Sequence, residues 1–182
     1  HGSFMLMFFT ATCFLVACYE WHMMTKKKSF KNYGFFFLVF SFYTFYELEL
    51  TIVLFVILIC VSTDIGGYIF GKIFKGPKLT KISPNKTYAG MIGGYFLSLI
   101  CLTIISNFID ANTPIQFFLL TLIISTVSQI GDIIISYFKR LSKIKDTGKI
   151  IPGHGGLLDR IDGMIFAFPV VYLINLTEYL NV

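Results

Sequence analysis

The feature that most constrains the fold is the separation of long apolar stretches from basic connections. All 15 Lys and Arg residues fall in three regions, 26–31, 72–86 and 139–160, and the apolar stretches hold almost no charge. Stretches of 20 or more apolar residues can cross about 30 Å of hydrocarbon as helices. Only 14% of the residues are charged, against about a quarter in soluble domains. The pattern predicts an all-α, polytopic integral membrane helical bundle.

About six apolar segments can be assigned, at roughly 4–19, 33–46, 50–70, 88–109, 115–138 and 161–177. The first and last are near the lower length limit for a span, and the second is short enough to be half of a hairpin. Glu47-Leu48-Glu49 favours a tight reversal between the second and third segments. The four cysteines all lie in apolar segments, which indicates small buried side chains and not a metal or disulfide site.

The basic regions are alternate connections of this six-segment arrangement. The positive-inside rule then predicts that they face the cytoplasm and that both termini lie on the opposite side. A role in setting the topology and in contacting anionic lipid would explain Lys26, Lys27 and Lys28. This role would not explain the acids and glycines that accompany the other two basic regions.

Asp132 interrupts the fifth apolar segment, about 10 Å from the basic region at 1.5 Å per residue. It belongs to a polar stripe with three- and four-residue spacing, made of Ser125, Ser128, Gln129, Asp132, Ser136 and Arg140. An ionised carboxylate at this depth is costly unless it is paired or binds a cation. Asp132 is therefore a structural ion-pair partner, a protonated acid, or a metal ligand facing a watery cavity.

A glycine-rich turn, Gly153-His154-Gly155-Gly156, precedes two more acids, Asp159 and Asp162. Glycines allow backbone N–H groups to approach an anion closely. The two acids are three residues apart at a predicted helix start, where they could complement the helix dipole or contribute carboxylates opposite Asp132 to a magnesium site. His154 could cap the turn, donate to phosphate or have no role.

A third group of polar residues spans 62–87. Asp64 lies in an apolar segment, and Gly66, Gly67 and Gly71 predict close helix packing. Residues 83–87, Ser-Pro-Asn-Lys-Thr, predict a turn that leads into the next helix, and turn and capping chemistry alone could explain them. No Walker A sequence is present. The acids and cations together suit a site at the inner membrane surface that holds phosphates and a divalent metal, with one soluble anionic reactant and one lipid.

At these residues the sequence resembles the phosphatidate cytidylyltransferase (CDP-diacylglycerol synthase) family. The shared signature is Ser136, Lys139, Arg140, Lys145, Asp146, Pro152, Gly153, His154, Gly155, Gly156, Asp159, Arg160 and Asp162. A second matching stretch is Thr63, Asp64, Gly66, Gly71, Lys72 and residues 83–87. The resemblance covers about residues 60–170. It divides the chain into N-terminal membrane helices (1–60) and a catalytic membrane region with two cytoplasmic basic loops (61–182).

The resemblance implies transfer of the cytidylyl group of CTP to phosphatidate, giving CDP-diacylglycerol and pyrophosphate in phospholipid biosynthesis. It implies Mg²⁺, with a monovalent cation such as K⁺ as a second candidate. The implied catalytic residues are Asp132, Asp159, Lys145, Asp146, Arg160 and His154. The implied substrate-binding residues are Ser83, Asn85, Lys86, Thr87, Lys139 and Arg140. The implied metal ligands are Asp132 and Asp159 first, with Asp162 and Asp64 beside them.

Two differences from the family pattern stand out. Family members often carry an aromatic residue, Glu and Gly after the Ser-Pro-x-Lys-Thr element, where this chain has Tyr88, Ala89 and Gly90. The family also usually has additional N-terminal spans, about two of which this chain is expected to lack. The expected partners are CTP, phosphatidate and membrane lipid, without nucleic acid and with a homodimer as an option. The expected location is a bacterial-type inner membrane.

Three other functions remain open from the sequence. A CTP-dependent lipid kinase would release CDP in place of pyrophosphate. A transport protein would use Asp64 and Asp132 along an ion path, and a non-catalytic lipid-binding subunit would bind lipid without turnover.

Overall fold

The computed structural model describes residues 4–26, 28–106, 114–150 and 155–177. These ranges contain seven helices: α1 (Phe4–Thr25), α2 (Lys31–Glu47), α3 (Leu50–Phe74), α4 (Tyr88–Ile105), α5 (Pro114–Leu141), α6 (Leu158–Ile161) and α7 (Met164–Asn175). They contain no β-strand, and Lys78 and Thr87 form an isolated antiparallel bridge. The all-α prediction is confirmed, and the reversal expected at residues 47–49 separates α2 from α3.

Four of the described helices, α1, α3, α4 and α5, are long and apolar enough to cross a membrane. The prediction of about six apolar segments is therefore slightly high as a number of full spans, because α2 has 17 residues and α7 has 12. Large apolar side chains cover the outside of the bundle; Phe36 is 75% exposed and Leu54 is 51% exposed. Such a surface is suited to hydrocarbon and not to water.

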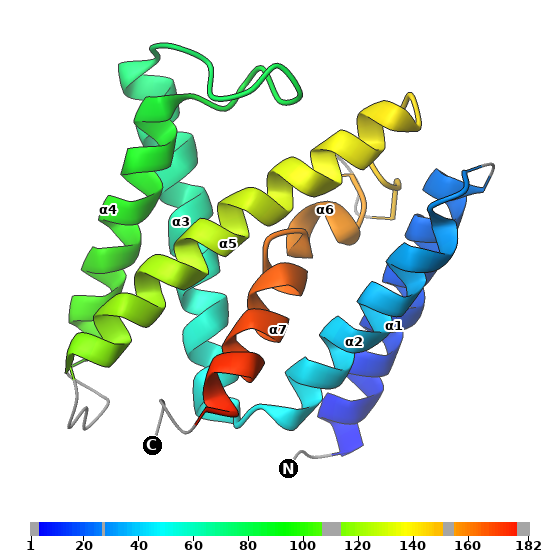
Figure 1. The fold of residues 1–182 in the computed structure, drawn as a ribbon, viewed down its shortest axis with the longest axis horizontal. Helices are drawn as coiled ribbons and strands as arrows, with labels where there is room; N and C mark the ends of the chain where they lie inside the picture. Colours follow the sequence, from blue (N-terminus) through cyan, green and yellow to red (C-terminus); the bar gives the residue numbers. More distant parts are fainter. Residues whose placement is uncertain (1–3, 27, 107–113, 151–154, 178–182) are drawn as a thin grey trace.

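Glycines bring α3 and α4 into close contact as a pair along one side of the bundle (Figure 1). A Cβ atom on Gly66 would lie 2.3 Å from the carbonyl oxygen of Gly93, and one on Gly90 would lie 2.7 Å from the carbonyl oxygen of Gly67. No side chain fits at these positions, so the two backbones approach directly. The close packing predicted from the glycines at 66 and 67 is confirmed.

Helix α5 crosses the bundle diagonally between the α3–α4 pair and the α1–α2 pair (Figure 1). Two buried clusters hold the helices together. The first joins α3, α5 and α7 and includes Ile59, Ile124 and Val171, all fully buried. The second joins α1, α2, α5, α6 and α7 and includes Trp21 and Leu158. Both clusters contain residues of α5 and α7, so the two helices link the halves of the bundle.

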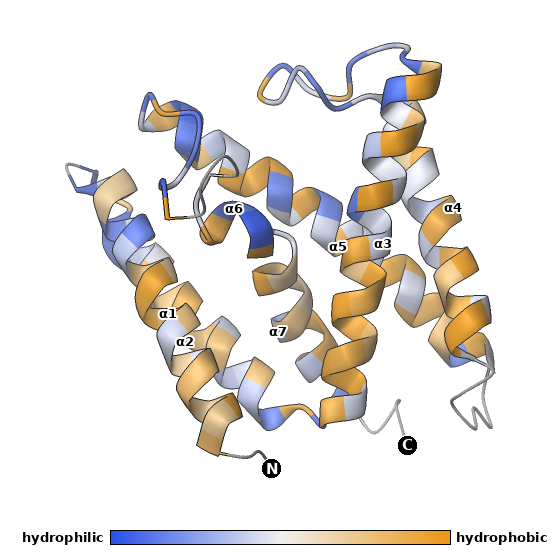
Figure 2. Ribbon diagram, turned by 180° about the vertical axis from the view of Figure 1, so that it is seen from behind, coloured by the Kyte–Doolittle hydropathy of each residue, from blue (hydrophilic) through white to orange (hydrophobic). Residues whose placement is uncertain are grey.

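The described parts of the three basic regions lie at one end of the bundle, and α1 begins and α7 ends at the other (Figure 1). Hydrophilic colouring gathers at the loop end and continues inward along α5 and α6 (Figure 2). The arrangement agrees with the alternation of basic and non-basic connections in the sequence.

The helix predicted to open with Asp159 and Asp162 and to continue through the last apolar segment, 161–177, is not continuous. A turn at Asp162–Gly163 divides it into α6 and α7. At Gly163 a Cβ atom would lie 2.2 Å from the hydroxyl oxygen of Ser128 on α5. The glycine therefore allows α7 to begin in direct contact with α5. The division turns α6 toward the polar interior, where its charged residues form part of the candidate site.

Candidate functional site

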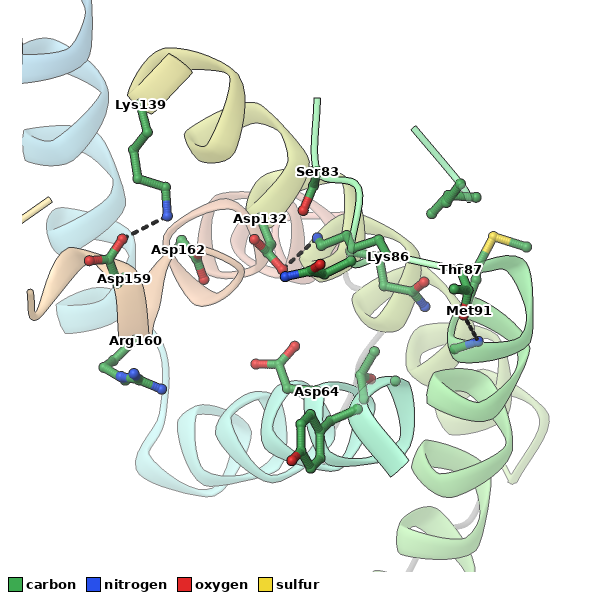
Figure 3. Close-up of a pocket in the computed structure, with 17 residues that line it drawn as sticks. Asp64, Ser83, Lys86, Thr87, Met91, Asp132, Lys139, Asp159, Arg160 and Asp162 are labelled. Atoms are coloured by element: carbon green, nitrogen blue, oxygen red, sulfur yellow. Dashed lines mark hydrogen bonds and ion pairs between the residues drawn. The ribbon is translucent and has the colours of Figure 1, made fainter. Parts of the chain in front are cut away.

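A cavity of about 390 Å³ opens between the α3–α4 loop and helices α3, α4, α5 and α6. Its charged lining residues are Asp64, Lys86, Asp132, Lys139, Asp159, Arg160 and Asp162. They come from four separate parts of the chain and point toward a common space (Figure 3). The cavity thus joins the three groups of polar residues that the sequence singled out.

Lys86 forms an ion pair with Asp132, with 2.5 Å between Lys86 Nζ and Asp132 Oδ2 (Figure 3). The loop that carries Lys86 is folded back on itself: Leu79 N donates to Lys86 O at 2.7 Å, and Tyr88 N donates to Pro77 O at 3.2 Å. Thr87 caps α4, because its hydroxyl oxygen accepts from Gly90 N at 3.1 Å. These contacts fix Lys86 above the middle of α5.

Two further carboxylates, Asp64 on α3 and Asp162 after α6, line the same cavity as Asp132. Asp162 lies within electrostatic range of both Asp64 and Asp132. Gln129, one helical turn before Asp132, has a buried side-chain nitrogen without a hydrogen-bond partner among the described residues. Closely spaced carboxylates repel each other unless a cation or a proton is shared between them. The carboxylates of Asp64, Asp132 and Asp162 offer only oxygen ligands, which suit a hard divalent cation.

Asp159 is held by its own loop. Its Oδ1 accepts from Lys139 Nζ at 2.7 Å, and its Oδ2 accepts from Thr147 N at 2.8 Å and from Gly156 N at 3.0 Å. Burial by itself would raise the pKa of Asp159, but the hydrogen bonds from Lys139, Gly156 and Thr147 lower it below its usual range. Both oxygens are thus engaged by the protein. Asp64 and Asp162 are the carboxylates that interact electrostatically with Asp132. The metal-binding role predicted for Asp132 together with Asp159 stays a prediction.

The described residues contain no group of three or more His, Cys, Asp or Glu side chains in ligating geometry. In this arrangement the ammonium group of Lys86 supplies the positive charge next to Asp132. A cation bound by Asp64, Asp132 and Asp162 would therefore require these side chains to converge and Lys86 to turn toward another anion.

The other residues predicted for the site divide into two groups. Ser83, Asn85 and Thr87 line the cavity. Arg140, Lys145 and Asp146 do not; their side chains are exposed, and Arg140 Nη1 donates to Ile144 O at 3.4 Å. His154 lies outside the described residues.

Glu20 on α1 was not anticipated from the sequence. Its side chain is 1% exposed and accepts three hydrogen bonds, from Thr147 Oγ1 at 3.0 Å, Leu157 N at 3.0 Å and Leu158 N at 2.8 Å. In the described part of the glycine-rich turn Gly156 donates its N–H to Asp159, and the two residues after it donate theirs to Glu20. The available signal was an acid directly after an apolar segment, away from the basic regions. Its partners are 127 to 138 residues away, and no local pattern predicts that contact.

Comparisons of the sequence with known proteins identify a family and several relatives. A sequence model of the cytidylyltransferase family matches residues 30–177. A phosphatidate cytidylyltransferase of Staphylococcus aureus (strain COL) is 44% identical over 139 residues, which are 74% of this chain and 54% of the relative. The protein of the same name from Staphylococcus saprophyticus is 43% identical over 124 residues, 67% of this chain and 48% of the relative.

The chain thus spans about half the length of the curated relatives that it matches. The matched family segment includes every charged residue of the cavity and the loop that carries Lys86. Most of the chain is covered by the match, and the chain belongs to the cytidylyltransferase family.

Proposed function

We propose that this chain catalyses CTP-dependent cytidylyl transfer to phosphatidate, giving CDP-diacylglycerol and pyrophosphate. One observation carries the proposal: carboxylates and cations from α3, α5, α6 and the α3–α4 loop converge on one polar cavity inside an otherwise apolar bundle. Family membership and the names of the Staphylococcus relatives support the same reaction.

In this reaction a phosphate oxygen of the lipid attacks the α-phosphorus of CTP. The new bond joins that oxygen to the α-phosphorus, and the bond from the α-phosphorus to the bridging oxygen of the β-phosphate breaks. Pyrophosphate leaves with the electron pair. The attacking oxygen is already anionic at neutral pH, so the main barrier is the approach of two anions and the charge on the leaving group.

The cationic side chains of the cavity are suited to that barrier. Lys86 and Lys139 are placed on opposite sides of Asp132, and Arg160 extends its guanidinium group toward the same space (Figure 3). An arginine can bind a phosphate through two parallel hydrogen bonds, and a lysine supplies a compact positive charge. We assign Lys86, Lys139 and Arg160 to phosphate binding, with Ser83, Asn85 and Thr87 at the nucleotide side of the cavity.

Asp64, Asp132 and Asp162 would hold a divalent cation, with Mg²⁺ the best match to an all-oxygen donor set that also includes substrate phosphate. When bound, the metal would neutralise charge on the phosphates and on the leaving pyrophosphate. Asp159 is assigned a different task from the other acids: it orients Lys139 and links Thr147 to Gly156 through their backbone N–H groups. A monovalent cation such as K⁺ remains a candidate for a second ion.

The cavity would open on the cytoplasmic side of the membrane, where CTP is available. Support comes from the positions of Lys and Arg, which are gathered at the loop end of the bundle. The organisms of the relatives support a bacterial cytoplasmic membrane. Assembly into a homodimer stays a prediction from the family resemblance.

The test is incubation of the purified protein with phosphatidate vesicles and Mg²⁺, using CTP labelled either at the α- or at the γ-phosphate. We expect the α-label in the lipid product and the γ-label in pyrophosphate. Transfer of the γ-label to lipid would identify a kinase, and binding of either substrate without turnover would identify a non-catalytic protein. Both results would refute the proposal.

An Asp132→Asn variant provides the site control, with Glu47→Gln at the opposite end of the bundle as its matched substitution. Removing the charge of Asp132 should abolish incorporation of the α-label, whereas Glu47→Gln should retain it. Equal activity in both variants would exclude this cavity as the site of transfer.

A further inference from the structure

Glu20 and Asp159 hold the same two stretches of loop from opposite sides. Glu20 accepts from Thr147 Oγ1 and from Leu157 N, and Asp159 accepts from Thr147 N and from Gly156 N. Each carboxylate therefore links the segment at Thr147 to the segment at residues 156–158. Asp159 lines the cavity, whereas Glu20 approaches from α1, behind the loop.

The loop is shaped to receive the Glu20 carboxylate. A Cβ atom on Gly148 would lie 2.5 Å from Glu20 Oε1, and one on Gly156 would lie 2.4 Å from Glu20 Oε2. Any side chain at either glycine would displace Glu20. The two glycines thus leave space for a carboxylate of the same chain, and two consecutive backbone N–H groups, those of Leu157 and Leu158, point at it.

Apolar packing around Glu20 connects this contact to the rest of the bundle. Ala17, Trp21 and Met24 share a buried cluster with Leu158 and with residues of α5 and α7. Leu158 is fully buried, and the next residues of the chain are Asp159 and Arg160, which line the cavity. A carboxylate this deeply buried is retained only where donors compensate for its lost hydration.

We propose that Glu20 is a positioning residue: it fixes the 157–162 segment so that Asp159, Arg160 and Asp162 are held at the cavity. The proposal rests on the proposed cytidylyl transfer for its functional consequence. The family match begins at residue 30 and does not include Glu20. The contact between Glu20 and the loop is therefore known from the structure and not from the family match. Glu20 is not among the residues that line the cavity, and it acts through Leu157, Leu158 and Thr147.

A residue that only stabilises the packing of α1 would give a different response to substitution. Loss of packing would lower the thermal stability and increase amide exchange across α1 and its neighbours. Loss of positioning would loosen residues 147–162 and lower kcat, with KM little changed, because interactions made chiefly in the transition state depend on placement.

The experiment compares the full chain with its Glu20→Gln and Thr147→Val variants in detergent or vesicles. Glutamine keeps the size of the side chain but has only one acceptor oxygen, and valine removes the hydroxyl donor while it keeps the backbone N–H that binds Asp159. Glu49→Gln, an exposed acid at the opposite end of the bundle, is the matched control. If Glu20→Gln does not fold, Thr147→Val alone tests the contact.

Amide hydrogen exchange gives a result that does not depend on turnover. We expect exchange at Leu157, Leu158 and the following residues to rise by about tenfold in Glu20→Gln, with α3 and α4 unchanged. Thr147→Val should change exchange in the same region less, and the double variant should resemble Glu20→Gln because the two residues share one contact. Unchanged exchange at 157–162, or an increase spread over the whole of α1, would overturn the proposal.

Steady-state kinetics then test whether the placement of residues 157–162 by Glu20 affects the rate of the proposed reaction. Glu20→Gln should lower kcat by on the order of tenfold with CTP and phosphatidate, with both KM values nearly unchanged and melting temperature close to that of the parent. Full kcat despite local loosening would refute the positioning role. A parent protein that transfers no α-label would refute the proposed function instead, and the exchange measurements would still decide whether Glu20 fixes this segment.

Discussion

Lys86 Nζ lies 2.5 Å from Asp132 Oδ2, and this pair connects the α3–α4 loop to the middle of α5. Lys86 and Asp132 are separated by 45 intervening residues of sequence; the loop supplies the cation and the helix supplies the acid. In the absence of substrate the pair keeps the carboxylate compensated. Because Lys86 pairs directly with Asp132, it would be the cation to exchange this acid for a phosphate in the proposed reaction with CTP.

Replacement of Lys86 by methionine should lower kcat/KM for CTP by about 10²–10³-fold, the loss typical of one electrostatic contact in a transition state. Methionine keeps an unbranched side chain that is one atom shorter than lysine, and it removes the charge. The measurement is initial-rate kinetics with varied CTP. Lys81→Met is the control, since Lys81 is an exposed residue of the same loop outside the cavity lining. Equal losses in both variants would indicate a general effect of loop charge.

Chelation of divalent metal should stop cytidylyl transfer, and added Mg²⁺ should restore it. Asp64→Asn and Asp162→Asn should each raise the half-saturating Mg²⁺ concentration by on the order of tenfold or more, which is about 1.4 kcal/mol of binding. Magnesium titrations of the rate at saturating CTP measure this directly. Activity that survives exhaustive chelation would rule out the metal role assigned to these acids.

The distribution of charge was enough to predict the class of fold. Cations confined to alternate connections predicted one polar end, and the described parts of all three basic regions lie there. Glycines at 66 and 67 predicted the close α3–α4 packing, because small residues allow backbones to approach wherever the partner helix lies. The turn that divides the last predicted helix into α6 and α7 was missed. It depends on Ser128 of α5 meeting Gly163, a tertiary contact that no local pattern encodes.

The sequence predicted the site residues that are isolated charges within apolar segments. Asp64 and Asp132 stood out because a carboxylate in an apolar helix demands an explanation, and both line the cavity with Asp162. The grouping among the acids was not predictable, since it depends on helix crossing: Asp159 faces Lys139 and the loop N–H groups. Glu20 was overlooked for the same reason, as its donors come from the far end of the chain.

Asp159 should stabilise the folded protein at neutral pH and lose that effect in acid. Because the folded state lowers its pKa, the stabilisation is present above the pKa of the unfolded carboxyl, about 4, and disappears as the pH falls through the lower folded value. Asp159→Asn should therefore lower the melting temperature at pH 7, by about 2–4 °C for each 1 kcal/mol lost.

The difference in melting temperature between the parent and Asp159→Asn should shrink below pH 4. Thermal unfolding in a fixed detergent at several pH values provides the measurement, with Glu47→Gln as a variant whose carboxylate is at the opposite end. A difference that stays constant from pH 7 to pH 3 would show that the charge of Asp159 does not contribute.

Two adjacent glycines of α3, Gly66 and Gly67, should differ in the stability that is lost when each is replaced by alanine. Gly66→Ala places a Cβ atom 2.3 Å from the Gly93 carbonyl oxygen, so the helices must separate, at a cost of about 1–3 kcal/mol. Gly67→Ala places its Cβ atom 3.6 Å from Gly90 O, an ordinary contact, and alanine favours the helix. Thermal unfolding should thus show a clear loss at 66 and none at 67. A similar loss at both positions would contradict the direct backbone packing.

The sidedness of the site can be tested with single cysteines at the two ends of the bundle. Lys81→Cys lies on the exposed α3–α4 loop and Glu49→Cys on the reversal between α2 and α3. If the basic loops face the cytoplasm, a membrane-impermeant maleimide added to intact cells should label Glu49→Cys, and should label Lys81→Cys only after lysis. The unsubstituted chain reports labelling of the four native cysteines, all of which lie in helices α1, α3 and α4. Labelling of Lys81→Cys in intact cells would place the cavity on the outer side, away from CTP, and would contradict both the orientation and the proposed reaction.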